Sequence, residues 1–370
     1  MLIFPVIILS LIIALCYYLL VVFLTYGWLN TKTFSVSEKI PLEKISILLP
    51  FRNEAKNLEN VIKDLLNQDY PSDLFEIIAI NDHSEDDFIK VFEKFGGKKI
   101  KLINLSEEES GKKQAIIKGL KASNFSTIAS VDADCRYTKK WLKTMVQFQI
   151  QMNADLVFAP VDFYGGSSFF GKLQNLEFLS LIGSGAGAAG IGNPIFCNGA
   201  NLIYKKEFAE NKNSFQESIP SGDDVFLLQS IKKKKGKINF LKSFEAISYT
   251  KPPNNLKEFV TQRKRWSSKA KNYKDSDSIL VSIIVFLNSF LLISLSIAGI
   301  FSELFLNVFI LLFVLKSLVD LIFFIPVLTF FKKQKLLIWF IPLQILYIIY
   351  VVFIGLFGTF GKNRWKGRTV

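Results

Sequence analysis

The feature that most restricts the fold of this chain is an apolar run at residues 2–29 that contains no charged side chain. The run exceeds the roughly 20 residues that an α-helix needs to cross the hydrocarbon core of a bilayer. A cleavable signal peptide would show a basic start, a shorter apolar stretch and a small-residue cleavage site, and this run has none of them. We therefore expect a retained transmembrane anchor over residues 1–30.

Three more apolar runs lie near the other end of the chain, at residues 279–301, 304–331 and 336–360. Each is too long for an ordinary buried helix of a globular domain. They predict a C-terminal transmembrane region of about three helices over residues 279–361, followed by a basic tail at residues 362–370.

Charged residues inside and beside these runs add two expectations. Lys316 and Asp320 are four residues apart within one run, so they share a helical face and can form an ion pair inside the helix bundle. Lys32 follows the first run, and the basic sequence FKKQK at residues 331–335 separates the last two. Because basic loops remain in the cytoplasm, we expect the middle of the chain on that side, although four full crossings would then put the basic tail outside.

The net charge of +13 narrows the possible partners. It suits a protein held against anionic lipid that binds a phosphorylated ligand. Duplex nucleic acid is the other common partner of such a charge, but the predicted spans disfavour it and we expect no nucleic-acid partner. Cys16, Cys135 and Cys197 show neither metal-ligand spacing nor a pairing pattern, which indicates a reducing compartment.

Between the anchors, residues 44–275 alternate short β-rich runs with helical patterns. The predicted strands are KISILLP (44–50), FEIIAI (75–80), KIKLINL (99–105) and STIASV (126–131). Such alternation predicts an α/β domain with a mostly parallel sheet and helices on both faces.

Polar residues follow three of these strands. They are the segment from Pro50 through Arg52 to Glu54, then Asp82 after the second strand, and Asp132 with Asp134 after the fourth. Ligands of open α/β sheets bind outside the carboxyl ends of the strands. An acidic turn formed by chance explains one of these groups but not all three, so we expect a ligand site at this edge.

The residue types suit a nucleotide diphosphate. Asp82 can accept hydrogen bonds from a ribose or a ring N–H, although Asp is also common in turns. Asp132 and Asp134 flank one residue after a strand, and two carboxylates so placed can hold Mg²⁺ or Mn²⁺ beside phosphate oxygens.

Three later segments each allow two interpretations. Asp223 and Asp224 precede an apolar-periodic helix, where they are either caps or a catalytic base. Gln262, Arg265 and Trp266 share one turn of a predicted helix, which is either functional or an interfacial segment before a span. The glycine-rich residues 165–195 are either a helix and loop packed under the sheet or an interfacial segment that admits a lipid-borne acceptor.

Five motifs occur in order along the chain, PFRNE, NDHSEDD, DAD, GDD and QRKRW. Together they resemble the membrane-bound family 2 glycosyltransferases with a GT-A fold, the Rossmann-like fold of nucleotide-diphospho-sugar transferases. The branch includes ceramide glucosyltransferase-like enzymes and polysaccharide synthases. The resemblance spans about residues 44–270, and the tail sequence RWKGR is similar to bacterial membrane lipid glycosyltransferases.

The resemblance implies roles for the residues already singled out. Asp224 would be the catalytic base, and Asp134, with Asp132, would bind Mg²⁺ or Mn²⁺. Donor contacts would come from Pro50, Arg52, Glu54, Asp82, Lys112, Asp132 and Arg265. Acceptor contacts would come from Asp223, Gln262 and Trp266. Gly222 and Asp223 stand where the family's motif has Thr and Glu.

The implied function is an inverting, metal-dependent hexosyltransferase. It would move a sugar from a nucleotide sugar, expected to be a UDP-sugar, to a membrane lipid or lipid-linked acceptor at a bacterial inner (plasma) membrane. A processive polysaccharide synthase is one alternative, which we expect to need more spans. A noncatalytic membrane scaffold that binds nucleotide sugars is another, and binding without turnover would favour it.

Overall fold

The structure is a computed structural model that describes residues 3–96, 100–210, 215, 222–358, 364–365 and 368–369. The chain divides into two compact units. The helical unit comprises Met1–Thr31, Gly166–Ile195 and Pro253–Asn363. The sheet unit comprises Lys32–Gly165, Phe196–Pro252 and Arg364–Val370. The basic tail predicted at residues 362–370 lies outside the described residues except for β11 (Arg364–Trp365) and β12 (Arg368–Thr369).

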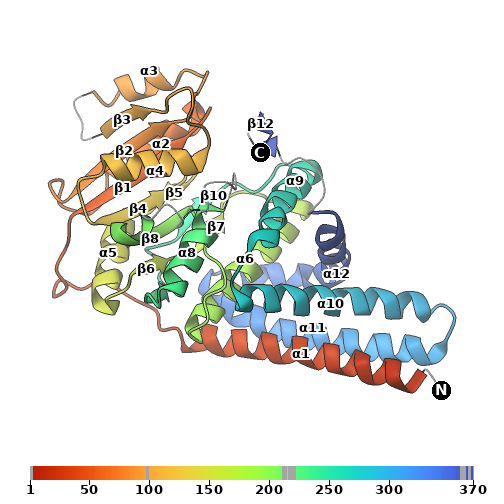
Figure 1. Cartoon of the computed structure of the whole chain (residues 1–370). Coiled ribbons are helices and arrows are strands. Elements are labelled where there is room, and N and C mark those ends of the chain that lie inside the picture. Colours follow the sequence, from red (N-terminus) through yellow and green to blue (C-terminus); the bar gives the residue numbers. More distant parts are fainter. Residues whose placement is uncertain are drawn as a thin grey trace. The chain divides into compact units, whose positions relative to one another are not determined.

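A seven-stranded sheet with the order β3-β2-β1-β4-β8-β6-β9 forms the centre of the sheet unit (Figure 1). Its strands are β1 (Ile45–Phe51), β2 (Phe75–Asn81), β3 (Ile100–Asn104), β4 (Thr127–Val131), β6 (Leu156–Phe158), β8 (Asn201–Lys205) and β9 (Ile238–Phe240). β1 pairs in parallel with β2 and β4, while β8 is antiparallel to both β4 and β6. The expected mostly parallel α/β sheet is confirmed, with β8 as the reversed strand.

Helices connect and cover these strands. They are α2 (Ala55–Leu66), α3 (Phe88–Glu93), α4 (Lys112–Ala122), α5 (Trp141–Met152), α7 (Lys206–Ala209) and α8 (Asp223–Lys233). α4 packs on β1 and β2, and α5 packs on β6 and β8. In α2 the apolar side chains recur at helical spacing, and Leu58, Val61, Ile62 and Leu65 are fully buried. Burial of each such side chain contributes about 1.5–3 kcal/mol relative to exposure.

A second, three-stranded sheet supports the turn that follows β4. Its order is β5 (Arg136–Tyr137), β10 (Ser248–Thr250) and β7 (Val161–Phe163). The Tyr137 hydroxyl accepts a hydrogen bond from the Asp132 main-chain N–H at 3.2 Å and donates one to the Ala200 carbonyl at 2.8 Å. The acidic turn is therefore held from both the large and the small sheet.

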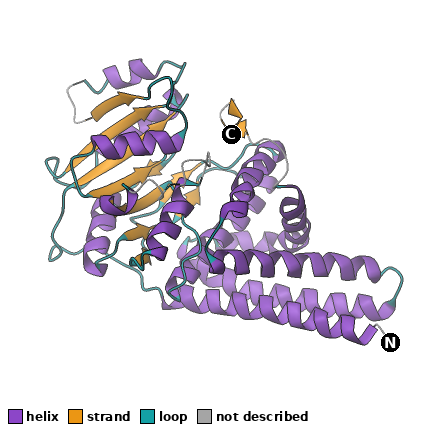
Figure 2. Cartoon of the chain, viewed as in Figure 1, coloured by secondary structure: helices purple, strands orange, loops and turns teal. Residues whose placement is uncertain are grey.

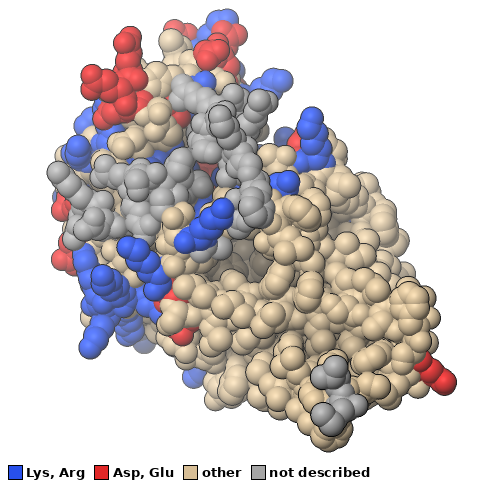
Figure 3. All heavy atoms as spheres, turned by 45° about the vertical axis from the view of Figure 1, so that its right-hand side comes forward, with Lys and Arg blue, Asp and Glu red and all other residues tan. Residues whose placement is uncertain are grey.

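Within the described residues, the helical unit contains four helical segments that are long and apolar enough to cross a membrane. They are α1 (Ile3–Asn30), α10 (Ser276–Ala298), α11 (Glu303–Phe330), and α12 (Phe340–Phe357) together with the 3₁₀ turn η2 (Gln334–Trp339) that precedes it. The expected arrangement of one N-terminal and three C-terminal apolar helices is confirmed. α1, α10 and α11 lie side by side (Figure 2). On the face drawn in Figure 3 these helices present a surface almost without charged side chains.

The expected ion pair between Lys316 and Asp320 is confirmed. The Lys316 ammonium lies 2.6 Å from Asp320 Oδ2 and also donates to Gln344 of α12. The Tyr17 hydroxyl of α1 donates to Asp320 Oδ1 at 2.8 Å. Because a charge inside an apolar bundle is costly without partners, this cluster joins α1, α11 and α12.

The glycine-rich segment is largely helical. Residues Phe169–Gly190 form one continuous helix, α6, that belongs to the helical unit and packs against α1. Its glycines allow close approach, since a Cβ on Gly187 would lie 2.2 Å from the Leu24 carbonyl oxygen. The run that looks broken in sequence is a helix whose small residues form a contact face. The unit also holds α9 (Leu256–Ser267) and a 3₁₀ turn, η1 (Ser268–Asn272).

Candidate active site

The parallel strands β1, β2 and β4 end at one edge of the large sheet, and the loops after β1 and β2 contact each other. The Asp82 main-chain N–H, just after β2, donates to the Phe51 carbonyl at the end of β1 at 2.9 Å. Pro50 lies in β1 opposite Ile80 of β2. Glu54 begins α2 as its N-cap residue, and its carboxylate accepts from the Asn57 side chain at 2.6 Å.

Arg52 holds the loop after β2. Its side chain is buried, and Nη1 donates to the carbonyl oxygens of Asp82 at 2.8 Å and His83 at 2.7 Å. Nη2 lies 3.4 Å from the Glu85 carboxylate. These contacts make Arg52 a support of the Asp82 loop, a role that the sequence did not reveal.

Asp82 connects this loop to the helix α4. The residue is 1% exposed, and its Oδ2 accepts from the Gly111 main-chain N–H at 3.1 Å. Oδ1 lies 3.1 Å from Nδ1 of His83. Gly111 adopts a positive φ of 90° at the N-cap of α4, a conformation that favours glycine. The residue that follows Gly111 is Lys112.

Lys112 bridges two acidic elements. Its ammonium lies 2.7 Å from Asp132 Oδ1, after β4, and 3.4 Å from Asp223 Oδ2, at the start of α8. Burial lowers the pKa of Lys112, but the charges of Asp132 and Asp223 outweigh it, so the net shift of the pKa is upward. Lys112 therefore remains a cation at the centre of the acidic group.

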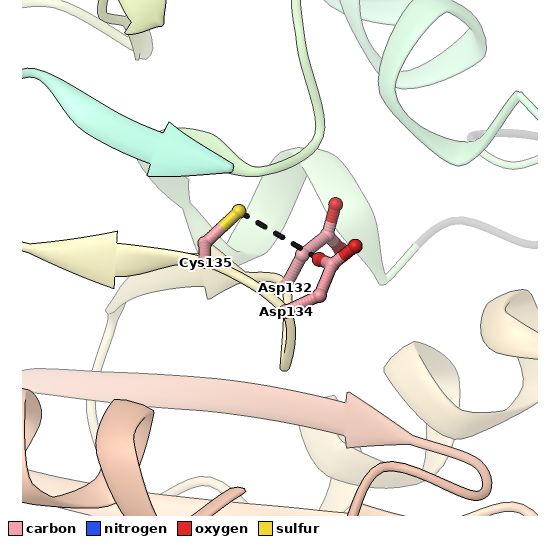
Figure 4. A group of neighbouring side chains, drawn as sticks. All are labelled: Asp132, Asp134 and Cys135. Atoms are coloured by element: carbon pink, nitrogen blue, oxygen red, sulfur yellow. Dashed lines mark hydrogen bonds between the residues drawn. The ribbon is translucent and has the colours of Figure 1, made fainter. Parts of the chain in front are cut away.

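Asp132, Asp134 and Cys135 form a possible cation site (Figure 4). One ligand atom from each residue lies within 4.8 Å of the others, and the carboxylates of Asp132 and Asp134 lie beside each other on the turn. Asp134 is exposed, whereas Cys135 is buried and its thiol lies 3.8 Å from Asp134 Oδ1. Burial and the Asp134 charge raise the pKa of Cys135, which keeps it a neutral thiol. The two carboxylates are oxygen ligands that fit Mg²⁺ or Mn²⁺.

Asp223 and Asp224 form the first turn of α8, after Gly222 with a positive φ of 91°. Asp224 Oδ2 accepts from the Gly199 main-chain N–H at 3.0 Å, and its Oδ1 accepts from the Val225 N–H at 2.8 Å. Carboxylates are stabilised at a helix N-terminus. The structure thus brings Asp223, Asp132 and Lys112 together and holds Asp224 beside them, next to Gly199.

Gly199 is a site residue that the sequence analysis missed. A Cβ at this position would lie 3.2 Å from the Lys112 ammonium and 3.4 Å from both Asp223 Oδ2 and Asp224 Cβ. Glycine therefore leaves room for these three side chains. Its position in CNGAN, just before β8, is the only sign of this role in the sequence.

Gln262, Arg265 and Trp266 lie on α9 in the helical unit, whereas the acidic residues and Lys112 lie in the sheet unit. α9 begins at a clear cap, because the Asn255 side chain accepts from the Glu258 N–H at 2.9 Å. Gln262 also accepts a hydrogen bond from Nη1 of Arg263 at 2.5 Å.

The sheet edge thus combines a pair of carboxylates that can hold a divalent cation, a half-buried lysine, and a second pair of carboxylates at a helix start. Such a set can bind a diphosphate and remove a proton from a nearby hydroxyl.

Part of this chain is similar to known proteins. The model for Glycosyl transferase family 2 matches residues 46–211. Glycosyltransferase AglE of Haloferax volcanii is 24% identical over 187 residues, covering 49% of this chain and 59% of that protein. The poly-beta-1,6-N-acetyl-D-glucosamine synthase of Staphylococcus epidermidis is 30% identical over 149 residues, covering 40% of this chain and 35% of that protein. The chain therefore spans less than two thirds of the length of these relatives.

A solved structure shares the fold. The mannosyltransferase PcManGT from Pyrobaculum calidifontis, in complex with GDP-Man and Mn²⁺, superposes with a TM-score of 0.63 at 15% identity, covering 95% of this chain and 98% of that one. The chain therefore has the fold of a GT-A domain with flanking apolar helices, and its residues 46–211 match glycosyl transferase family 2.

Proposed function

We propose that the chain is an inverting glycosyltransferase that moves a sugar from a nucleotide sugar to a membrane lipid or lipid-linked acceptor. The observation that supports this most is the bridge of Lys112 between Asp132 and Asp223 beside Asp224. This bridge places a cation suited to a diphosphate next to a carboxylate that can act as a base, at one edge of the sheet. The proposed division is an anchor at residues 1–30, a catalytic domain at 44–275, and membrane helices at 279–361.

In the proposed reaction, Asp224 accepts the proton of the acceptor hydroxyl while that oxygen attacks the anomeric carbon. The bond from this carbon to the diphosphate breaks, and a nucleoside diphosphate leaves with its electron pair, so the configuration inverts in one displacement. Asp82 holds the nucleoside, and Lys112 and Arg265 balance the charge of the diphosphate. Asp134 and Asp132 would hold Mg²⁺ or Mn²⁺, and such a cation would neutralise phosphate charge.

Gln262, Trp266 and Asp223 are the proposed acceptor contacts, and the Pro50–Glu54 loop completes the donor site. Four apolar helices favour an acceptor that is itself in the membrane. The basic residues after the first span favour a catalytic domain on the cytoplasmic side of a bacterial inner membrane.

A processive polysaccharide synthase is a second candidate, supported by the similarity to the Staphylococcus epidermidis synthase. The two candidates differ in product length. Single-sugar lipid products favour the first, and a ladder of growing chains favours the second.

The test is release of nucleoside diphosphate from a panel of UDP- and GDP-sugars by the detergent-purified chain with total bacterial lipid. We expect one donor to be turned over, with release that requires both added lipid and Mn²⁺ and that stops with EDTA. Donor binding without any release, even with lipid present, would instead support the noncatalytic scaffold.

A further inference from the structure

Arg263, the second residue of QRKRW, is buried, whereas the other four residues of this motif are partly exposed. Arg263 is 2% exposed, and its guanidinium meets both oxygens of the Glu177 carboxylate of α6. Nε donates to Oε1 at 3.1 Å, and Nη2 donates to Oε2. This two-point geometry is the strongest form of the arginine–carboxylate pair and fixes the guanidinium plane.

Arg263 in turn contacts both of the motif side chains that we assign to the acceptor. Its Nη1 donates to Gln262 Oε1 at 2.5 Å, and its Cζ lies 4.2 Å from the centre of the Trp266 ring. Arg263 also lies 4.6 Å from the Phe259 ring centre. A planar guanidinium stacked on aromatic rings restricts the orientation of those rings.

Glu177 is suited to hold this arrangement and has no other assigned role. Its side chain is almost fully buried in the middle of α6, between apolar neighbours. The next residue, Phe178, contacts the Trp266 ring with centres 6.4 Å apart, and the Tyr350 hydroxyl of α12 donates to Glu177 Oε1 at 3.4 Å. A buried carboxylate is costly unless it is paired, so Arg263 has one favoured position, against α6.

We propose that Glu177 is a positioning residue that acts through Arg263 to hold Gln262 and Trp266 in the orientation that receives the acceptor. The proposal rests on the proposed function for its consequence, which is acceptor affinity. All of the contacts that carry it lie within the helical unit.

The kinetic test compares Glu177→Gln and Arg263→Lys with the unchanged chain. Glu177→Gln keeps the shape of the side chain but removes its charge, and Arg263→Lys keeps the charge but removes the planar fork. We expect the concentration of total bacterial lipid that gives half-maximal release of nucleoside diphosphate to rise about tenfold in both. The donor KM should stay within about twofold, because all of the proposed donor contacts except Arg265 lie outside α9.

Asp320→Asn is the matched control, since it removes the charge from another buried ion pair of the same unit. Its thermal stability should fall, while the lipid dependence of release should match that of the unchanged chain. Equal lipid dependence in Glu177→Gln, Arg263→Lys and the unchanged chain would overturn the proposal. So would an equally large change in Asp320→Asn.

A second measurement needs no turnover. Subtracting the emission of a Trp266→Phe chain isolates the fluorescence of Trp266, and acrylamide quenching then reports its exposure. We expect quenching of Trp266 to increase about twofold in Glu177→Gln and Arg263→Lys but not in Asp320→Asn, because the stacked guanidinium is released. Altered quenching in a chain that releases no nucleoside diphosphate would reject the proposed function and keep the positioning role. Unaltered quenching in both folded variants would reject the positioning role.

Discussion

Lys112 lies between the two pairs of acidic residues at the candidate site. Its contacts with Asp132 and Asp223 balance charges that would otherwise repel each other and a diphosphate. Their attraction exceeds the effect of burial, so the pKa of Lys112 lies above its ordinary value. A group whose pKa is raised on folding keeps its proton up to a higher pH than in the unfolded chain.

The first prediction concerns the pH dependence of donor binding. The stabilising charge of Lys112 is fully present below the ordinary lysine pKa of about 10.4 and is lost only as the pH rises through the higher folded value. We therefore expect Lys112→Gln to raise the Kd for UDP, measured with Mn²⁺ present, about tenfold. This ratio should be the same at every pH from about 7 to 9.5. Titration calorimetry at several pH values measures this. A factor that shrinks steadily between pH 7 and pH 9 would show that Lys112 loses its proton there.

The second prediction concerns the cation. Asp134 is exposed at the turn and supplies a carboxylate to the possible cation site. We expect Asp134→Asn to weaken Mn²⁺ binding at least about tenfold, because an amide replaces an anionic oxygen ligand. Electron paramagnetic resonance of free Mn²⁺ measures the affinity. Asp155→Asn is the control, since that carboxylate pairs with Lys205 outside the cluster, and equal affinities in the two variants would argue against the site.

For single residues, the sequence predicts which residue types lie at the sheet edge, but not which hydrogen bonds and ion pairs they form. The order of strands and the acidic residues after them are enough to expect Asp82, Asp132 and Asp134 at one edge. The contacts of Lys112 with Asp223 and of Arg52 with the Asp82 loop depend on rotamers and on tertiary packing. The space that Gly199 leaves for its neighbours becomes visible only when three separate elements are assembled.

Among the elements, the crossing of α1 and α6 is built on small residues. A Cβ on Gly27 would lie 1.9 Å from the Gly187 carbonyl oxygen, and one on Gly190 would lie 2.1 Å from the Gly27 carbonyl oxygen. Backbone meets backbone here, which is the geometry that small residues allow between helices in membranes.

The third prediction tests this crossing. Gly187→Ala would place a methyl group against the backbone of α1, which cannot rotate away, so we expect a loss of about 1–3 kcal/mol in the free energy of unfolding. Gly183→Ala is the matched control, because its Cβ would meet the side-chain tips of Val327 and Phe323 at 2.8–2.9 Å, which can move. Thermal unfolding in detergent, followed by circular dichroism, compares the two. A larger loss in Gly183→Ala would contradict the account.

Helices with a strong apolar pattern can be predicted from the sequence, as for α2 and the four long apolar helices. α6 could not be assigned with the same certainty, because Gly and Ala weaken both the helix propensity and the apolar pattern. α6 makes its most extensive contacts with α1 (Ile3–Asn30), which lies far earlier in the sequence. The glycines that allow this contact are visible in the sequence, but the helix that they contact is not.

On the scale of the whole molecule, the chain alternates between its two units. The helical unit takes three separate segments of the chain, and the QRKRW helix and Glu177 come from two of them. The acidic residues and Lys112 belong to the sheet unit. Most of the proposed donor contacts are therefore in the sheet unit, whereas the proposed acceptor contacts Gln262 and Trp266 are in the helical unit. A linear division of the sequence gives no means of assigning the segment Gly166–Ile195 to the same unit as the four long apolar helices.

The central claim is that Asp224 removes the acceptor proton during sugar transfer. The most direct measurement is transfer of a radiolabelled sugar from the active donor into the lipid phase by the full chain with Mn²⁺ and total bacterial lipid, compared with Asp224→Asn. The account predicts that the variant binds the donor nucleotide as the unchanged chain does and transfers sugar about 10²–10⁴-fold more slowly. Transfer at an unchanged rate in Asp224→Asn would contradict it.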